Sequence, residues 1–328
     1  MNSLPAMTDT EDRPRLVEIP GNPAPESLVV GTLKTSDGRR LRHAVSNLPN
    51  RSRGTVLILQ GRNESIEKYF ETISDLNRRG FSVATFDWRG QGGSERLIRR
   101  RSLGHVRHFG QYLLDLECIL QDVVLPDCRG PYVVLGHSMG GLIALHGATR
   151  LANSIECMVL CAPLLGFVRE RPGLKTVHRL ARLASWTGFG RSPIRRAIPG
   201  KIPNPADNPL TSDGERFERN RRLAQAAPDL FLGSPTVSWL AAVTGAMRRL
   251  ESSREIARLS VPTLFVTAGG DSVVSTQAIE RLAWRMRCGS SVTIPLARHE
   301  LLQEADRFRE QALEAFDAYV SGSLPVAA

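Results

Sequence analysis

The sequence contains no apolar run long enough to cross a bilayer. A membrane-spanning helix needs about 20 consecutive apolar residues, whereas the strand-like runs, such as Val56 to Leu59, extend over only a few residues. The first 25 residues also lack a basic stretch followed by an apolar one, which argues against a secretory signal. The sequence therefore predicts a cytoplasmic chain that does not cross a membrane.

Cysteine is scarce as well. The five cysteines are odd in number and include no Cys-x-x-Cys pair, so they indicate neither a disulfide framework nor a zinc site. We expect thiols packed in the core, at Cys118, Cys128, Cys157, Cys161 and Cys288. No motif implies a metal or an organic cofactor.

Lysine is the rarest charged residue, with four among 43 basic residues, and the net charge of +10 is unevenly spread. The segment 169–222 holds thirteen basic and five acidic residues, whereas the rest of the chain is nearly neutral. This segment has no nucleic-acid-binding motif, so we expect no nucleic-acid partner.

The remaining composition is that of a folded globular protein. Hydrophobic residues make up 41% of the 328 positions, charged residues make up 23%, and the mean hydropathy is −0.18. A sizeable core is therefore possible and disorder is excluded. The length is about twice the ~150-residue average of a domain, so either one large domain or one domain with an insertion is expected.

Strands and helices alternate in two parts of the chain. The first part opens with a β-hairpin closed at Asp37-Gly38. Apolar periodicity then predicts strands at 56–59, 82–86, 132–135, 155–160, 263–267 and 291–294, and helices at 65–79, 109–125, 140–151, 275–287 and 304–320. This order predicts a mostly parallel sheet with helices on both faces and a site at the carboxyl ends of the strands.

The stretch between the two parts is rich in Pro, Gly and Arg and contains no convincing strand. We interpret it as an insertion over the sheet, with a helix at Leu174–Trp186. The expected organisation is a leader at 1–27, a core at 28–162 and 236–321, an inserted cap or lid at 163–235, and a tail at 322–328.

A G-x-S-x-G motif, Gly136-His137-Ser138-Met139-Gly140, lies between a predicted strand and a predicted helix. A sharp strand-to-helix turn places the serine hydroxyl above the sheet, and the flanking glycines give the turn the space it needs. This context predicts that Ser138 is a nucleophile.

A serine nucleophile needs a histidine to accept its proton and an acid to orient that histidine. His299 is the one histidine that follows Ser138 at the carboxyl end of a predicted strand, and we expect the other six to be surface or packing residues. Asp271 follows the strand at 263–267 and is the predicted acid, in the order Ser, acid, His. Asp87 is the alternative acid, which we interpret as structural.

The reaction also needs backbone donors for the tetrahedral intermediate. On this scaffold they come from the residue after the nucleophile and from the loop after the first parallel strand. We therefore predict an oxyanion hole formed by the N–H groups of Met139 and Arg62, and little tolerance for change at Gly61.

The chain resembles the α/β-hydrolase fold and, within it, the bacterial lysophospholipase and monoacylglycerol lipase group. The resemblance extends from about Leu28 to Tyr319, is weakest over 163–235, and rests on G-H-S-M-G at 136–140, D-W-R-G-Q-G-G-S at 87–94, G-D at 270–271 and H-E-L at 299–301. Monoacylglycerol lipases usually have His-Gly where this chain has Gln60-Gly61, and the following Gly61-Arg62 is closer to the bacterial lysophospholipases.

The resemblance implies a serine hydrolase that cleaves carboxylic esters of lysophospholipids or monoacylglycerols through an acyl-enzyme. The same core also serves short-chain carboxylesterases, thioesterases and peptidases. A second class, a non-catalytic scaffold that binds a ligand, usually loses part of the triad, which this chain retains. An Arg62 side chain near the acyl-binding edge either meets a phosphate or turns to solvent.

The predicted helix at 174–186 is amphipathic and basic. Periodicity places Leu174, Val177 and Leu180 near one face and Arg179 and Arg182 off it. Such a helix suits peripheral contact with an anionic membrane surface, at the inner face of the membrane. The alternative is a helix packed on the insertion with solvated arginines.

Overall fold

A computed structural model describes residues 14–48, 52–168, 172–195 and 208–324. Its centre is an eight-stranded sheet in the order β1-β2-β4-β3-β5-β6-β7-β8. Strand β2 is antiparallel to β1 and β4, and the other pairs are parallel. The strands are β1 (Leu28–Lys34), β2 (Arg40–Ser46), β3 (Thr55–Leu59), β4 (Ser82–Phe86), β5 (Tyr132–His137), β6 (Cys157–Cys161), β7 (Thr263–Ala268) and β8 (Gly289–Ile294).

Helices cover both faces of the sheet, as the alternating pattern predicts. The α-helices are α1 (Phe70–Arg78), α2 (Gly110–Ile119), α3 (Leu125–Asp127), α4 (Met139–Leu151), α5 (Leu174–Trp186), α6 (Gly214–Ala226), α7 (Val237–Ser252), α8 (Thr276–Arg285) and α9 (Asp306–Ser323). Shorter helical turns are η1 (Ile66–Tyr69), η2 (Leu120–Val124), η3 (Phe189–Arg191), η5 (Pro228–Leu230), η6 (Glu255–Arg258) and η7 (Leu301–Gln303). The predicted α/β fold is therefore confirmed. Within the described part of the chain, no helix is both long and apolar enough to span a bilayer.

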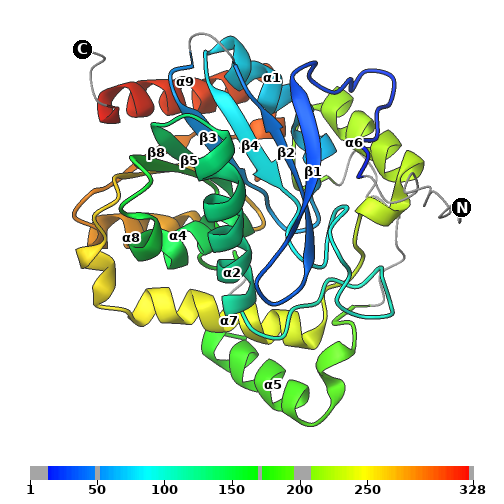
Figure 1. Cartoon of the computed structure of the whole chain (residues 1–328). Coiled ribbons are helices and arrows are strands. Elements are labelled where there is room, and N and C mark those ends of the chain that lie inside the picture. The colour runs from blue at the N-terminus through cyan, green and yellow to red at the C-terminus, as the bar shows by residue number, and fades with distance from the viewer. Residues whose placement is uncertain (1–13, 49–51, 169–171, 196–207, 325–328) are drawn as a thin grey trace, which may run out of the picture.

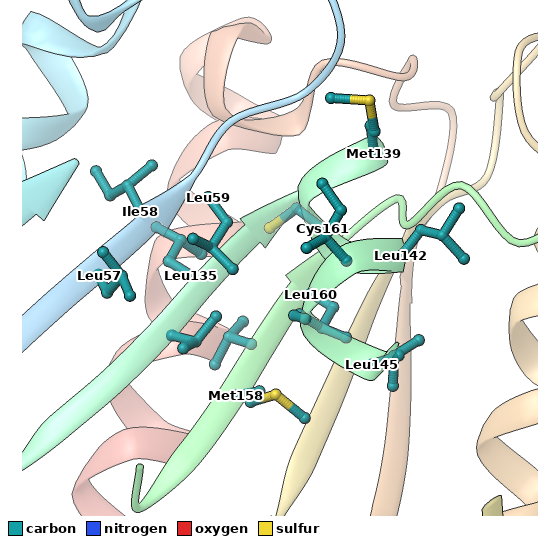
Figure 2. Packing of buried hydrophobic residues seen from close by; sticks show 14 of the residues in the cluster. Leu57, Ile58, Leu59, Leu135, Met139, Leu142, Leu145, Met158, Leu160 and Cys161 are labelled. Carbon is teal, nitrogen blue, oxygen red and sulfur yellow. The ribbon is translucent and has the colours of Figure 1, made fainter. Parts of the chain in front are cut away.

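The core lies on the central strands and on the helix that follows the serine. Strands β3, β6 and β7 are buried along their whole length, because helices cover both faces of a parallel sheet. Figure 2 shows the side chains of β3, β5, β6 and α4 that form this core, including Leu59, Leu135, Leu142 and Leu160. This packing fixes the turn between β5 and α4, on which the site is built.

Helix α5 lies in the segment 163–235 that we predict to be an inserted cap. Helix α5 packs on α7, and the two run side by side at the bottom of Figure 1, far from the C-terminus. The helix predicted at 174–186 is confirmed with the same bounds. Helices α6 and α7 were not predicted, and α7 contacts both α5 of the cap and α4 of the core. The cap boundaries at 163 and 235 stay predictions.

The outward face of α5 differs from the expectation. Leu180 is 60% exposed, although periodicity placed it on the apolar face with Leu174 and Val177. The side that packs toward α7 contains the one buried residue of the helix, Ala181, and the half-buried Val177. Leu180, Leu183 and Trp186 therefore share the outer surface with Arg179 and Arg182.

Candidate active site

Ser138 occupies a strained turn between β5 and α4. Its φ of 49° and ψ of −111° lie in a region that L-residues rarely adopt. The turn passes so close to β3 that a Cβ at Gly140 would lie 2.0 Å from the Leu59 carbonyl oxygen. Only glycine fits there, which explains the second glycine of the G-x-S-x-G motif.

The same edge of the sheet collects other strained residues. Among the described residues, four that are not glycine have a positive φ, and each follows the carboxyl end of a parallel strand: Asn63, Ser138, Ala162 and Leu296, after β3, β5, β6 and β8. Strained backbone is retained where the surrounding structure enforces it, and such residues gather at functional sites. The carboxyl edge is therefore the candidate active site.

His299 and Asp271 meet Ser138 at this edge. His299 Nε2 lies 3.1 Å from Ser138 Oγ, and His299 Nδ1 lies 2.8 Å from Asp271 Oδ2. The other carboxylate oxygen of Asp271 accepts the N–H groups of Val273 and Val274, at 2.7 and 3.0 Å. The predicted convergence of the three side chains is thus observed, while their catalytic roles stay predictions.

Asp87, the alternative acid, is held elsewhere. Its Oδ2 accepts Arg42 Nε at 2.7 Å and the Gly93 N–H at 2.7 Å, and its Oδ1 accepts the Ile66 N–H at 3.0 Å. These bonds organise the loop that follows β4. The interpretation of Asp87 as structural agrees with this arrangement.

The predicted oxyanion donors lie in two places. Met139 is the first residue of α4, so its N–H is one of the four that have no acceptor within the helix. The loop at 60–64, here called the oxyanion loop, is anchored by the D-W-R-G-Q-G-G-S segment. Trp88 Nε1 donates to the Gln60 carbonyl at 2.9 Å, and Gln91 Nε2 donates to the Gly61 carbonyl at 2.9 Å. The assignment of Arg62 and Met139 as donors stays a prediction.

The Arg62 side chain turns toward the cap rather than to open solvent. Its Nη2 donates to the Gly233 carbonyl at 2.5 Å, and its Cζ lies 5.4 Å from the ring centroid of Trp239. Its Nε is buried without a hydrogen-bond partner in the structure. Burial lowers the pKa of Arg62 to about 10, so the guanidinium remains charged at neutral pH.

A buried group of charges behind the serine was missed by the sequence analysis. Lys68 Nζ lies 2.8 Å from Glu64 Oε1 and 2.6 Å from Glu300 Oε1, and all three side chains are almost fully covered. Glu64 Oε2 accepts the Tyr69 hydroxyl at 2.6 Å and the Gly61 N–H. The i, i+4 spacing of Glu64 and Lys68, in a chain with four lysines, was the available signal.

His137, expected to be a packing or surface residue, belongs to this group. Its Nδ1 lies 3.3 Å from Glu64 Oε2, and its Nε2 lies 3.3 Å from the His299 carbonyl oxygen. Burial alone would lower the pKa of His137, but the neighbouring Glu64 carboxylate outweighs it and raises that pKa above the ordinary value. Burial would raise the pKa of Glu64, yet Lys68 and His137 hold it well below its usual range.

No metal centre emerges in the part of the chain that the structure describes. There, no three His, Cys, Asp or Glu side chains are arranged so that they would hold a metal ion.

The sheet order, the serine at the β5–α4 turn and the two partner residues beyond it define an α/β-hydrolase. The family described as serine aminopeptidase, S33, matches residues 50–306, and the chain belongs to this family. The predicted resemblance to lysophospholipases and monoacylglycerol lipases is confirmed by proteins with similar sequences.

Known proteins with similar sequences carry lipase names. The chain is 32% identical over 276 residues to lysophospholipase L2 of Escherichia coli (strain K12), a match that covers 79% of this chain and 78% of that protein. It is 27% identical over 273 residues to probable lysophospholipase L2 of Haemophilus influenzae, with 82% and 84% covered. A soluble variant of monoglyceride lipase from Saccharomyces cerevisiae, solved with a substrate analog, shares the fold with a TM-score of 0.71 at 19% identity, covering 90% of this chain and 97% of that chain.

Proposed function

We propose that the protein is a serine hydrolase that cleaves carboxylic esters of lipid-like substrates through an acyl-enzyme. The observation that carries the proposal is the relay Ser138 Oγ to His299 Nε2 at 3.1 Å and His299 Nδ1 to Asp271 Oδ2 at 2.8 Å. Each distance is within the range in which a proton is shared or transferred.

In the first half-reaction, Ser138 Oγ attacks the ester carbonyl carbon while its proton passes to His299 Nε2. Asp271 holds the imidazole so that Nδ1 keeps its proton and Nε2 is free to accept one. The N–H groups of Arg62 and Met139 stabilise the oxyanion of the tetrahedral intermediate. The intermediate then expels the alcohol, which takes its proton from His299.

In the second half-reaction, water replaces the alcohol. His299 accepts a proton from the water as it attacks the acyl carbon, and returns that proton to Ser138 Oγ as the carboxylic acid leaves. Neither step requires a group outside the chain other than substrate and water.

The preferred substrates are monoacyl lipids, either a lysophospholipid or a monoacylglycerol. The likeness to lysophospholipase L2 over most of both chains supports this class. A cavity of about 460 Å³ also lies between α5, α7 and α8, a size in the range of small-molecule sites. Its wall combines apolar side chains with charged ones: Leu165, Val177, Met247 and Leu282 with Lys175, Glu251, Arg281 and Arg285. Leu165 follows Leu164, whose N–H donates to the Ser138 carbonyl at 2.9 Å.

Peripheral contact with an anionic membrane is part of the proposal. Leu183 is 57% and Trp186 85% exposed on α5, beside Arg179 and Arg182. Apolar side chains flanked by cations suit the boundary between acyl chains and anionic headgroups. The five cysteines are free thiols, which supports a location in the reducing cytoplasm.

The family description leaves a second candidate, a peptidase on the same triad. Thioesters and short-chain esters would use the same steps, whereas a non-catalytic binding protein would use none of them. A side-by-side assay of a lysophospholipid, a monoacylglycerol, short p-nitrophenyl esters and an amino-acid amide separates these classes. Rates that fall steadily as the acyl chain lengthens would contradict the lipid proposal.

Ser138→Ala tests the nucleophile directly. We expect ester hydrolysis to fall by at least about 10³-fold, because the residual rate would come only from binding and the oxyanion donors. Labelling by a fluorophosphonate probe should disappear in the same variant. Ser82→Ala is the matched control, since Ser82 is also buried but is the first residue of β4, at the opposite end of the strands from Ser138. Full activity in Ser138→Ala would refute the proposal.

A further inference from the structure

The buried charges behind Ser138 connect three loops that the proposed reaction needs. The cluster consists of Glu64, Lys68, His137 and Glu300, here called the buried charge cluster. Glu64 accepts the Gly61 N–H and so holds the oxyanion loop. His137 belongs to the turn that carries the nucleophile, and Glu300 directly follows His299.

Lys68 is the residue that joins these parts. Its ammonium lies between Glu64 at 2.8 Å and Glu300 at 2.6 Å, and the second pair connects residues 232 positions apart in the sequence. A lysine has three donors and no acceptor, so it serves both carboxylates at once. Lys68 therefore ties the loop that contains Glu300 to the oxyanion loop, so that one loop cannot move without the other.

The hydrogen-bond partners of His137 favour its cationic form. Its Nδ1 faces the Glu64 carboxylate and its Nε2 faces the His299 carbonyl oxygen, each at 3.3 Å. Both partners accept and neither donates, so the doubly protonated ring is the form that donates to both of them at once. The imidazolium form then donates to the main chain of His299, with the two rings 5.1 Å apart between centroids.

With His137 as a cation, the buried charge cluster contains two positive and two negative groups. Burial of charged groups is costly unless they are paired with good geometry, and a buried ion pair adds little net stability compared with apolar residues. Stability alone therefore gives a weak reason for four ionised side chains behind a nucleophile. The contacts of the cluster to the Gly61 N–H and to the His299 carbonyl give a specific reason for its charges, which is to hold these two loops in place.

We propose that Glu64, Lys68, His137 and Glu300 are positioning residues, which hold the His299 loop and the oxyanion loop in register with Ser138. This inference rests on the ester hydrolysis proposed above and adds residues to it. The cluster is not placed in contact with substrate, so its loss should lower kcat and leave KM nearly unchanged.

Glu300→Gln is the principal test, because the amide keeps the shape and Lys68 retains Glu64 as a partner. We expect kcat for a monoacyl lipid to fall about 10- to 100-fold, since a displacement of about 1 Å in a catalytic group has costs of that order. Asp75→Asn is the matched control. Asp75 is a buried carboxylate paired with Arg309 between α1 and α9, and its loss should lower the melting temperature without lowering kcat.

The pH profile gives a readout that a merely structural role would not produce. The groups that surround His137 are Glu64, Lys68 and Tyr69 on one side, His299 and Glu300 on another, and Cys161 on the neighbouring strand. Removing the negative Glu300 disfavours the His137 cation, so kcat/KM should begin its alkaline decline at lower pH. Removing the positive Lys68 favours the cation, so Lys68→Met should decline at higher pH than the wild type.

The outcomes separate this inference from the proposed function. A wild-type protein that neither reacts with a fluorophosphonate nor hydrolyses esters contradicts the proposed function itself. An active wild type with the same kcat in Glu300→Gln as in Asp75→Asn overturns the positioning role, and so do alkaline limits that shift in the same direction in both cluster variants. If Lys68→Met does not fold, the comparison of kcat between Glu300→Gln and Asp75→Asn alone tests the positioning role.

Discussion

Gly61, the one glycine of the oxyanion loop, has no room for a side chain. A Cβ there would lie 2.8 Å from Glu64 Oε2 and 2.9 Å from His137 Nδ1, inside the buried charge cluster. Gly61→Ala should therefore displace the loop and lower kcat by about 10²-fold, the cost of one misplaced oxyanion donor. Steady-state kinetics on a soluble ester measures it. Gly214→Ala is the control, because a Cβ at the first residue of α6 meets nothing within 4 Å, and an equal loss in both variants would contradict the argument.

Single residues were predictable where a local motif marks them. Ser138, Asp271 and His299 each follow a strand whose apolar run is visible in the sequence, and their order along the chain is that of the scaffold. The contact of Lys68 with Glu300 joins residues 232 positions apart and leaves no local pattern. His137 lies inside the recognised motif, yet its charge depends on Glu64, which only the folded chain brings within 3.3 Å.

At the scale of elements, the outer face of α5 makes a prediction about membranes. Leu180, Leu183 and Trp186 are 60%, 57% and 85% exposed, so replacing all three with serine should leave the fold intact. Binding to anionic vesicles should weaken at least about tenfold, because each buried apolar side chain contributes on the order of 1.5–3 kcal/mol. Co-sedimentation at low salt measures it.

The control for that prediction is Trp284→Ser, which removes an 88% exposed side chain from α8 instead. It should bind vesicles like the wild type. A triple variant that binds vesicles as well as Trp284→Ser would show that α5 is not the membrane contact. If the wild type itself does not bind anionic vesicles at low salt, the proposed membrane contact is contradicted altogether.

Helices and strands were predicted well where regularly spaced apolar residues extend to both ends of the element, as in α5. Helix α6 was missed because its sequence is dominated by charged residues, and its first turn is instead stabilised by Asp213, whose side chain accepts the Arg216 N–H at 2.7 Å. The prediction of which face of α5 is buried was wrong at Leu180. Packing against α7 decides which face is buried, and the apolar spacing within α5 does not reveal that partner.

At the scale of the molecule, the alternation of strands and helices predicted the sheet. The way in which the inserted segment attaches to the core was not predictable. Helix α6 is held to the core through Arg216. Its guanidinium pairs with Glu71 of α1 at 2.5 Å and with Asp306 at the start of α9 at 2.7 Å. Glu71 and Arg216 are 145 positions apart, so no local pattern in the sequence indicates their pairing.

This attachment of the cap predicts a loss of stability in acid. Burial would raise the pKa of Glu71, but Arg216, Arg309 and Arg219 lower it from 4.5 to about 2. The folded chain therefore holds this carboxylate ionised where the unfolded chain would protonate it, and the stabilisation present above pH 4.5 is lost as the pH falls toward 2. Glu71→Gln should lower the urea midpoint at pH 7 and flatten its fall between pH 4.5 and 2. Glu218→Gln is the control, since Glu218 pairs with Arg221 within α6 and does not connect the cap to the core; equal midpoints for the two variants at pH 7 would show that the Glu71 contacts do not hold the cap.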